Sequence, residues 1–279
     1  MADPARSGYA AQIEEWRERR LERLTGPTGW LSLTGLHWLE EGDNGIGADP
    51  ASRVALPAGT APPRAGLLRV TGGQVRLEPS PDAAFEIGGQ RIAGPSVLVT
   101  DASEGPTVFT LGNLTLEVLA RSGRLAVRVR HAENPARQSL RPIPIFPVDR
   151  AWRFDAVFEA YDPPKTIPIT SILGTVEQET CPGAIAFSAG GRRLRLEPIL
   201  ERGEKDYWVI FGDLTNGHET YGGGRFVYVP PPVFGRTVLD FNKAYNPPCV
   251  FTPYTTCPLP PPQNRLPIRV EAGEKKYEG

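Results

Sequence analysis

Glycine and proline interrupt this chain at short intervals, which excludes long regular elements over most of its length. Each of them occurs 30 times among 279 residues, and together they exceed a fifth of the chain. No fixed repeat or low-complexity tract assigns them to linkers. Because proline removes a backbone donor and glycine admits unusual backbone angles, the pattern predicts many short strands joined by turns.

Two series of strand-like segments support this interpretation. Between Leu67 and Val129, and again from Arg153 to Asn242, apolar and polar residues alternate in short units bounded by turn-forming residues. A period of two is typical of half-buried strands. No flexible linker separates the two series. We therefore expect a mainly β fold with a single antiparallel barrel or sandwich over residues 1–279, or alternatively two β lobes that share one sheet.

One helix is predicted at the amino terminus, within residues 1–26. Over residues 8–25, Tyr9, Ile13, Trp16 and Leu24 fall on one stripe. Gly26 and Pro27 end the pattern. The sequence RERRLERL could indicate an RNA-binding arm, but its interleaved glutamates favour a solvated face of a helix that packs on the β body.

Three further segments complete the expected domain. Residues 27–50 carry too many apolar side chains for an exposed loop and should be buried. Residues 67–239 form the β body, in which 139–150 alternates proline with apolar residues and should lie at an edge or crossing. Residues 240–279 form a proline-rich strap and a final strand.

Composition and charge exclude several function classes. The net charge is −1, from 31 basic and 32 acidic side chains, so no nucleic-acid or membrane partner is expected. No apolar run reaches the length of a membrane helix, and the start lacks the order of a signal peptide, which predicts a cytoplasmic protein. Three cysteines do not form a disulfide framework. Neither a cofactor nor a metal site is predicted, and the oligomeric state is left open.

Two stretches near the carboxyl end carry the candidate site. The loop TNGHETYGGGR, residues 215–225, combines acid, base and cation side chains with three consecutive glycines. Residues 240–266 contain seven prolines, which hold polar side chains in place at low entropic cost. The candidate ligand-binding residues are Tyr221, Arg225, Asn242, Tyr245, Asn246, Asn264 and Arg265, and the candidate catalytic residues are Glu219 and Asp240.

The same polar side chains also fit a structural interpretation. A rigid strap could cover a sheet edge while Asn242, Asn246 and Asn264 bond to backbone groups. Cys181, Cys249 and Cys257 are most simply small buried side chains. A nucleophilic cysteine would need a lowered thiol pKa, which the sequence does not reveal.

Three blocks of the sequence resemble a known family. They are GWLSLTGLHWLEEGDNGIG, GDLTNGHETYGGGRF and DFNKAYNPPCVFTPYTTCPLPPPQNRLPIRVEAGEK, and together they are similar to the microbial family known as domain of unknown function 1684. The resemblance implies no biochemical role. It implies shared motif positions at Trp30, Gly42, Thr220, Tyr221, Arg225, Asp240, Asn242, Tyr245, Asn246, Cys249, Cys257, Asn264 and Arg265.

Three functional hypotheses follow from the residues, and whether the protein is an enzyme is left open. The first is binding of a small polar or anionic molecule in a pocket capped by residues 240–266, because guanidinium groups bind oxyanions through paired hydrogen bonds. The second is a cofactor-independent hydrolase that uses Glu219 or Asp240 as a base, with Arg225 or Arg265 as oxyanion partner. The third is a structural or interaction module.

Overall fold

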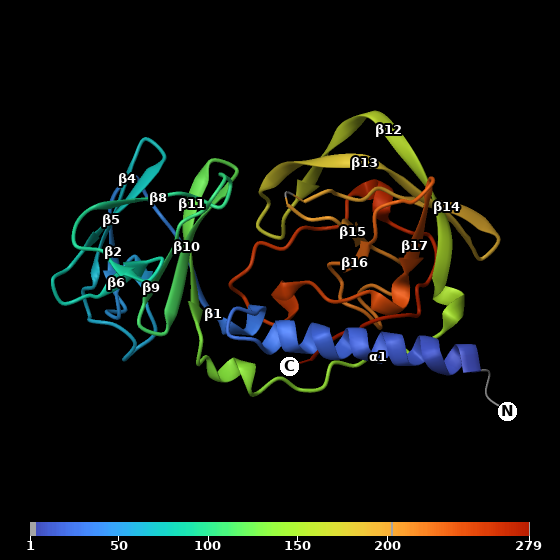
Figure 1. Cartoon of the computed structure of the whole chain (residues 1–279), viewed down its shortest axis with the longest axis horizontal. Coiled ribbons are helices and arrows are strands. Elements are labelled where there is room, and N and C mark those ends of the chain that lie inside the picture. Colours follow the sequence, from blue (N-terminus) through green and yellow to red (C-terminus); the bar gives the residue numbers. More distant parts are fainter. Residues whose placement is uncertain (1–3, 202, 279) are drawn as a thin grey trace. The chain divides into compact units, whose positions relative to one another are not determined.

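The computed structural model describes residues 4–201 and 203–278 and shows a mainly β protein with an amino-terminal helix (Figure 1). The predicted fold class is thereby confirmed. The chain divides into two compact units. The C-terminal unit comprises Met1–Leu21, Arg141–Phe251 and Thr256–Gly279, and the N-terminal unit comprises Glu22–Leu140 and Thr252–Thr255. Each unit has a hydrophobic core of its own, and the single domain expected over residues 1–279 stays a prediction.

The N-terminal unit contains two sheets. Their strand orders are β1-β11-β10-β9-β6-β7 and β3-β2-β4-β5-β8, with antiparallel neighbours except for the parallel pair β2 and β3. The first sheet contains β1 (Leu33–Trp38), β6 (Phe85–Ile87), β7 (Gln90–Arg91), β9 (Val108–Leu111), β10 (Leu114–Arg121) and β11 (Arg124–His131). The second contains β2 (Gly42–Gly47), β3 (Val54–Ala55), β4 (Gly66–Thr71), β5 (Gln74–Pro79) and β8 (Ser96–Leu98).

Alternation along the strands builds the core between these two sheets. On β4, Leu68 and Val70 are buried while Leu67 and Arg69 face outward. The buried faces of both sheets contribute to one apolar cluster, as expected for a sandwich-like arrangement. The predicted strand segments between residues 67 and 129 coincide with β4 to β11.

The apolar segment 27–50 becomes part of this sandwich. It forms a short 3-10 turn, η1 (Trp30–Ser32), and then β1 and β2. Leu31, Leu33 and Ile46 are buried, in line with the sequence-based expectation. The two strands were not recognised in the sequence because their glycines interrupt the alternation.

The C-terminal unit contains a four-stranded antiparallel sheet and a separate hairpin. The sheet has the order β14-β13-β12-β17, and the hairpin pairs β15 with β16 (Figure 1). The strands are β12 (Arg153–Thr170), β13 (Val176–Ala189), β14 (Arg192–Leu196), β15 (Tyr207–Phe211), β16 (Arg225–Val229) and β17 (Arg236–Asp240). Apolar side chains from both elements form the core, with aromatic contacts around the buried Phe241.

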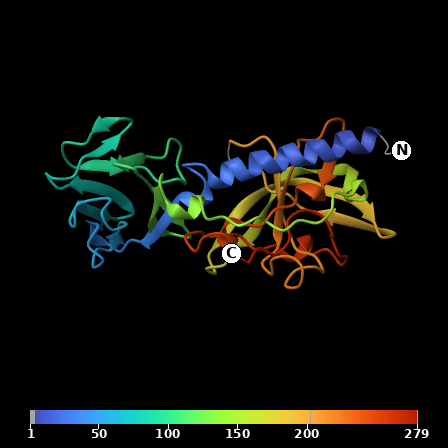
Figure 2. The ribbon, with the colours of Figure 1, turned by 90° about the horizontal axis from the view of Figure 1, so that it is seen from below.

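Helix α1 (Pro4–Thr25) lies along the C-terminal unit through its first part (Figure 2). Ile13 and Tyr9 are buried, whereas Leu21 is 46% exposed. The helix ends immediately before Gly26, as the sequence predicts. In the described ranges, no helix has both the length and the apolar character that a membrane crossing requires.

The remaining turns are short 3-10 helices. Residues 139–150, which include an alternation of proline and apolar residues, form no sheet strand. The turns are η2 (Pro135–Arg137), η3 (Arg150–Trp152), η4 (Phe241–Lys243), η5 (Pro248–Val250) and η6 (Pro262–Asn264). Three of them lie within residues 240–266, so this proline-rich segment is a series of tight turns.

Candidate functional site

The proline-rich segment 240–266 is fixed to the strands of the C-terminal unit by backbone hydrogen bonds. Tyr245 exchanges two bonds of 2.9 Å with Phe226 of β16. The amide of Gly212 donates to the Asn264 carbonyl at 3.0 Å, and Leu259 donates to Thr170 at 2.8 Å. Because these contacts are spread along the segment, it is held in place at several points.

Three asparagines of the segment bond inward to backbone groups. Asn242 donates to the Asp149 carbonyl at 2.8 Å and accepts from the Asp149 amide at 3.0 Å. Asn264 donates to the carbonyls of Glu197 and Ile210 at 2.8 and 2.9 Å. Asn246 donates to Lys275 at 2.8 Å, while its buried Oδ1 has no hydrogen-bond partner in the described ranges. These side chains satisfy main-chain groups that would otherwise be buried and unpaired.

Asp240 lies at the end of β17 in a buried cluster with Tyr9 of α1. The Tyr9 hydroxyl donates to both carboxylate oxygens, at 2.8 and 2.9 Å, and the Asn242 amide donates at 3.1 Å. Burial, followed by the hydrogen bond to Asp240, raises the pKa of Tyr9. The cluster therefore joins the helix to the end of a strand.

Arg225 begins β16 and is fully buried. Its guanidinium forms a 2.9 Å ion pair with Asp213, whose side chain is also 0% exposed. It further donates to the carbonyls of Val270 at 2.8 Å, Ala272 at 2.5 Å and Glu274 at 3.2 Å. Burial lowers the pKa of Arg225, and the Asp213 carboxylate opposes this effect. Arginine remains protonated in proteins, and here the Asp213 carboxylate compensates the buried charge.

The two remaining charged candidates lie near the surface. Glu219 forms an ion pair with Arg269 and is partly exposed. Arg265 is exposed. The ion partner of Glu219 is thus Arg269, and that of Arg225 is Asp213, so both charges are engaged with protein groups, whereas the hydrolase hypothesis uses Glu219 or Asp240 as a base and Arg225 or Arg265 as oxyanion partner. That hypothesis stays a prediction.

Tyr245 belongs to an aromatic cluster. Its ring contacts Phe226, stacks on Tyr228 with centroids 6.1 Å apart, and lies 4.4 Å from the guanidinium of Arg20. Arg20 also forms a 2.7 Å ion pair with Glu274. These contacts join α1 to the hairpin and to the end of the chain.

Tyr221 contacts the two cysteines of the proline-rich segment. The Cys249 thiol lies 3.6 Å from the Tyr221 hydroxyl, and the Cys249 amide donates to the Cys257 sulfur at 3.0 Å. Cys249 is partly exposed, while Cys257 and Cys181 are buried. Hydrogen bonds from Cys257 and Tyr221 lower the pKa of the Cys249 thiol to about 7, although burial acts in the opposite direction. Sequence reasoning treated all three cysteines alike and missed this difference.

The glycine-rich loop before β16 allows this segment to approach closely. Gly224 has φ +88°, and a Cβ built there would lie 2.3 Å from Cγ of Pro260 and 2.6 Å from the Phe211 carbonyl. Only glycine fits both the backbone angle and the space. The loop therefore serves the packing of the proline-rich segment.

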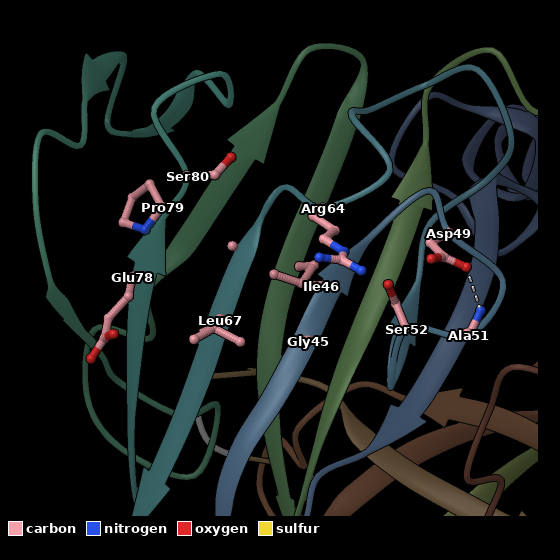
Figure 3. A pocket seen from close by; sticks show the side chains of 11 residues that line it. Gly45, Ile46, Asp49, Ala51, Ser52, Arg64, Leu67, Glu78, Pro79 and Ser80 are labelled. Carbon is pink, nitrogen blue, oxygen red and sulfur yellow. Dashed lines mark hydrogen bonds between the residues drawn. The ribbon is translucent and has the colours of Figure 1, made fainter.

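A surface cavity of about 640 Å³ lies in the N-terminal unit, on β2, β4 and β5 (Figure 3). Its polar lining includes Asp49, Ser52, Arg64, Glu78 and Ser80. The complete lining also contains Gly45, Ile46, Ala51, Gly66, Leu67 and Pro79. None of the predicted site residues lines it.

Close backbone contacts place Arg64 beside this cavity. The amides of Ala48 and Asp49 donate to the carbonyls of Pro62 and Pro63 at 2.9 and 3.1 Å. This approach needs Gly47, because a Cβ there would lie 2.1 Å from the Pro63 carbonyl. Hence β2 and the residues before β4 lie side by side.

The charged groups of the cavity differ in their pairing. Glu78 forms a 3.2 Å ion pair with Arg69, and Asp49 accepts from the Ala51 amide at 2.9 Å (Figure 3). The exposed Arg64 has no ion-pair partner in the described part of the chain. The Ser80 hydroxyl is buried without a hydrogen-bond partner there. An arginine that has no ion-pair partner among the described residues therefore lines the cavity.

No cluster suited to a metal ion accompanies these sites. Residues 4–201 and 203–278 contain no group of three or more His, Cys, Asp or Glu side chains that could hold one. The groups described above are a thiol pair in one unit and a cavity with one arginine in the other.

The fold and these sites define a mainly β protein whose carboxyl-terminal region is held by a buried polar network. Residues 138–275 match the model of the family described as "Protein of unknown function (DUF1684)", which confirms the resemblance over that segment. The second and third sequence blocks quoted above lie within the matched residues, whereas the block at 29–47 precedes them.

Two solved structures show partial likeness. The solution NMR structure of an uncharacterized protein from Haloarcula marismortui is 26% identical, covers 50% of this chain and 78% of its own, and has a TM-score of 0.42. A structure described as an FHA domain in phosphothreonine-dependent interactions is 19% identical, covers 34% of this chain and 92% of its own, and has a TM-score of 0.24. No curated protein matches the chain.

Proposed function

We propose that the protein binds a small polar molecule with an anionic group, and that Arg64 is the partner of that group. The observation that supports this proposal is an arginine that has no ion-pair partner in the described ranges and lies beside a cavity of about 640 Å³. This volume lies within the range of small-molecule sites, roughly 300–1,000 Å³. Guanidinium groups bind carboxylates and phosphates with two parallel hydrogen bonds.

The rest of the lining favours a polar ligand. Ser52 offers a hydroxyl, and Ser80 also lines the cavity, although its own hydroxyl oxygen is buried. Asp49 adds a carboxylate, which disfavours a ligand that carries negative charge at every end. A molecule with one carboxylate or phosphate and neutral donors elsewhere fits this lining.

The alternative ligand site for the same function is the pocket expected under residues 240–266. Most of its candidate residues, including Arg225, Asn242 and Asn264, are engaged with protein groups, as described above. A ligand there would have to replace these contacts, which costs more than filling an existing cavity. The cavity beside Arg64 is therefore the better-supported place.

A thermal-shift and calorimetric titration with inorganic phosphate, gluconate and a nucleoside monophosphate tests the proposal. A probe at 100 times its Kd should stabilise the protein by about 2.7 kcal/mol. Arg64→Gln should abolish this stabilisation, while Arg76→Gln, an exposed arginine of β5 outside the cavity, should retain it.

A second variant tests whether binding requires the open volume of the cavity as well as the charge of Arg64. Gly45 lines the cavity, and a Cβ at this position would meet no atom within 4 Å, so the side chain of Gly45→Leu should occupy part of the cavity and obstruct a ligand there. It should weaken binding and leave the melting temperature of the unliganded protein nearly unchanged. Probes that bind Arg64→Gln and Gly45→Leu as tightly as the natural sequence would exclude this cavity as the binding site.

A further inference from the structure

Cys249 and Cys257 form a thiol pair in the C-terminal unit that the proposed ligand site does not involve. The Cys257 sulfur accepts a hydrogen bond of 3.0 Å from the Cys249 amide nitrogen. That nitrogen is separated from the Cys249 sulfur by three covalent bonds, so rotation of one side chain can bring the two sulfurs together. The proline-rich backbone on either side holds both residues in place.

The two thiols differ in exposure and in environment. Cys249 is partly exposed, whereas Cys257 is 4% exposed. The Tyr221 hydroxyl lies 3.6 Å from the Cys249 sulfur. Once Cys249 loses its proton, this phenol can donate to the thiolate, which stabilises the reactive form. An accessible, stabilised thiolate beside a buried second thiol is the arrangement of an attacking and a resolving cysteine.

We propose that Cys249 and Cys257 carry out thiol–disulfide exchange with a low-molecular-weight disulfide, with Cys249 as nucleophile, Cys257 as resolving thiol and Tyr221 as positioning residue. The Cys249 thiolate attacks one sulfur of the disulfide, whose S–S bond breaks. A mixed disulfide forms and one small thiolate leaves and takes up a proton. Cys257 then loses its proton and attacks the Cys249 sulfur. The protein disulfide forms and the second small thiolate leaves, so two protein thiols are oxidised and one external disulfide is reduced.

The buried Cys181 provides a matched control. Its thiol donates to the Gly183 carbonyl at 3.2 Å, and burial raises its pKa. At pH 7 a thiol with a pKa of about 7 is half ionised, whereas an ordinary thiol of pKa about 8.5 is ionised to roughly 3%. Iodoacetamide should therefore modify Cys249 at least about tenfold faster than Cys181.

Peptide mapping of the full chain tests the exchange directly. The reduced protein is incubated with oxidised glutathione, quenched with iodoacetamide and digested with trypsin, which leaves both cysteines on the peptide 244–265. The expected product of the natural sequence is this peptide lighter by two hydrogens, without carbamidomethyl groups. In Cys181→Ser the same product should form.

Single variants assign the two roles. Cys257→Ser should accumulate glutathione on Cys249, and Cys249→Ser should leave Cys257 as a thiol. Tyr221→Phe should move the pH midpoint of Cys249 alkylation upward and slow alkylation at pH 7 severalfold, which a purely structural role would not do. Circular dichroism of each variant establishes that it is folded.

Three outcomes would overturn the proposal. The first is a natural protein whose Cys249 and Cys257 both remain thiols in oxidised glutathione. The second is a natural protein that keeps glutathione on Cys249 without closing the internal disulfide. The third is glutathione on Cys257 in Cys249→Ser. Because Arg64 lies outside the thiol pair, failure here leaves the ligand-binding proposal unaffected.

Discussion

Replacing the buried Arg225 with methionine should destabilise the protein strongly. Methionine retains most of the side-chain length but removes the ion pair with Asp213, in which both side chains are 0% exposed. An uncompensated buried charge costs about 3–5 kcal/mol. The carbonyls of Val270, Ala272 and Glu274 also lose a donor, which adds to this cost. We therefore expect a loss at the upper end of that range.

Urea unfolding followed by tryptophan fluorescence and circular dichroism measures this loss. Arg269→Met is the matched control, since Arg269 pairs with Glu219 and Glu271 but is 44% exposed. Exposed pairs contribute about 0–1 kcal/mol. The double variant Arg225→Met/Asp213→Asn should be less destabilised than the sum of the single changes, because it removes the unpaired charge. Equal losses for Arg225→Met and Arg269→Met would refute the assigned role of Arg225.

Two further predictions concern the same unit. Gly224→Ala should cost more than about 2 kcal/mol, because its φ is +88° and the new Cβ would lie 2.3 Å from Cγ of Pro260. Gly222→Ala, whose nearest contact would be 3.7 Å away, should cost less than about 1 kcal/mol, and similar melting temperatures for the two would contradict this reasoning. Burial raises the pKa of Glu197, but hydrogen bonds from Lys165, Tyr161 and Gln263 outweigh it and lower the pKa below 4.5. Because the pKa of Glu197 is lower in the folded protein than in the unfolded chain, its ionised carboxylate stabilises the fold at pH values above the unfolded-state pKa. This stabilisation is lost as the pH falls through the folded-state pKa. Glu197→Gln should therefore flatten the decline of the urea midpoint below about pH 4.5. Parallel declines in the two proteins would argue against this.

Local patterns predicted the mainly β fold and the helix because they depend on short-range periodicity. The stripe of Tyr9, Ile13 and Leu24 is buried in the structure, and β4 to β11 follow the alternating units. The alternation of apolar and polar residues did not predict strands β1 and β2, because glycines replace side chains where two backbones approach each other, as at Gly47. The sequence left open whether the chain forms one domain or two β lobes, because such a division depends on long-range contacts that no local pattern encodes.

The sequence located the rigid segment but not the directions of its side chains. Arg225 and Asp240 are candidates for binding or catalysis by residue type alone. Only the fold reveals that Arg225 already pairs with Asp213 and that Asp240 already accepts a hydrogen bond from Tyr9. The difference among the cysteines is equally invisible in a sequence. Cys249 contacts Tyr221 from a loop 28 residues away, and that contact sets its thiol apart.

The abundance of asparagine in a proline-rich segment has a structural cause. Seven prolines between residues 240 and 266 remove seven backbone donors, so the segment cannot satisfy neighbouring carbonyls through a regular ladder. Side-chain amides supply the missing donors: Asn264 donates to the carbonyls of Glu197 and Ile210, and Asn246 to that of Lys275. The amide nitrogens used in this way are already paired and have little left to offer a ligand. Reactivity should therefore be sought at groups that do not serve backbone carbonyls, namely the Cys249 thiol of this segment and Arg64 in the other unit.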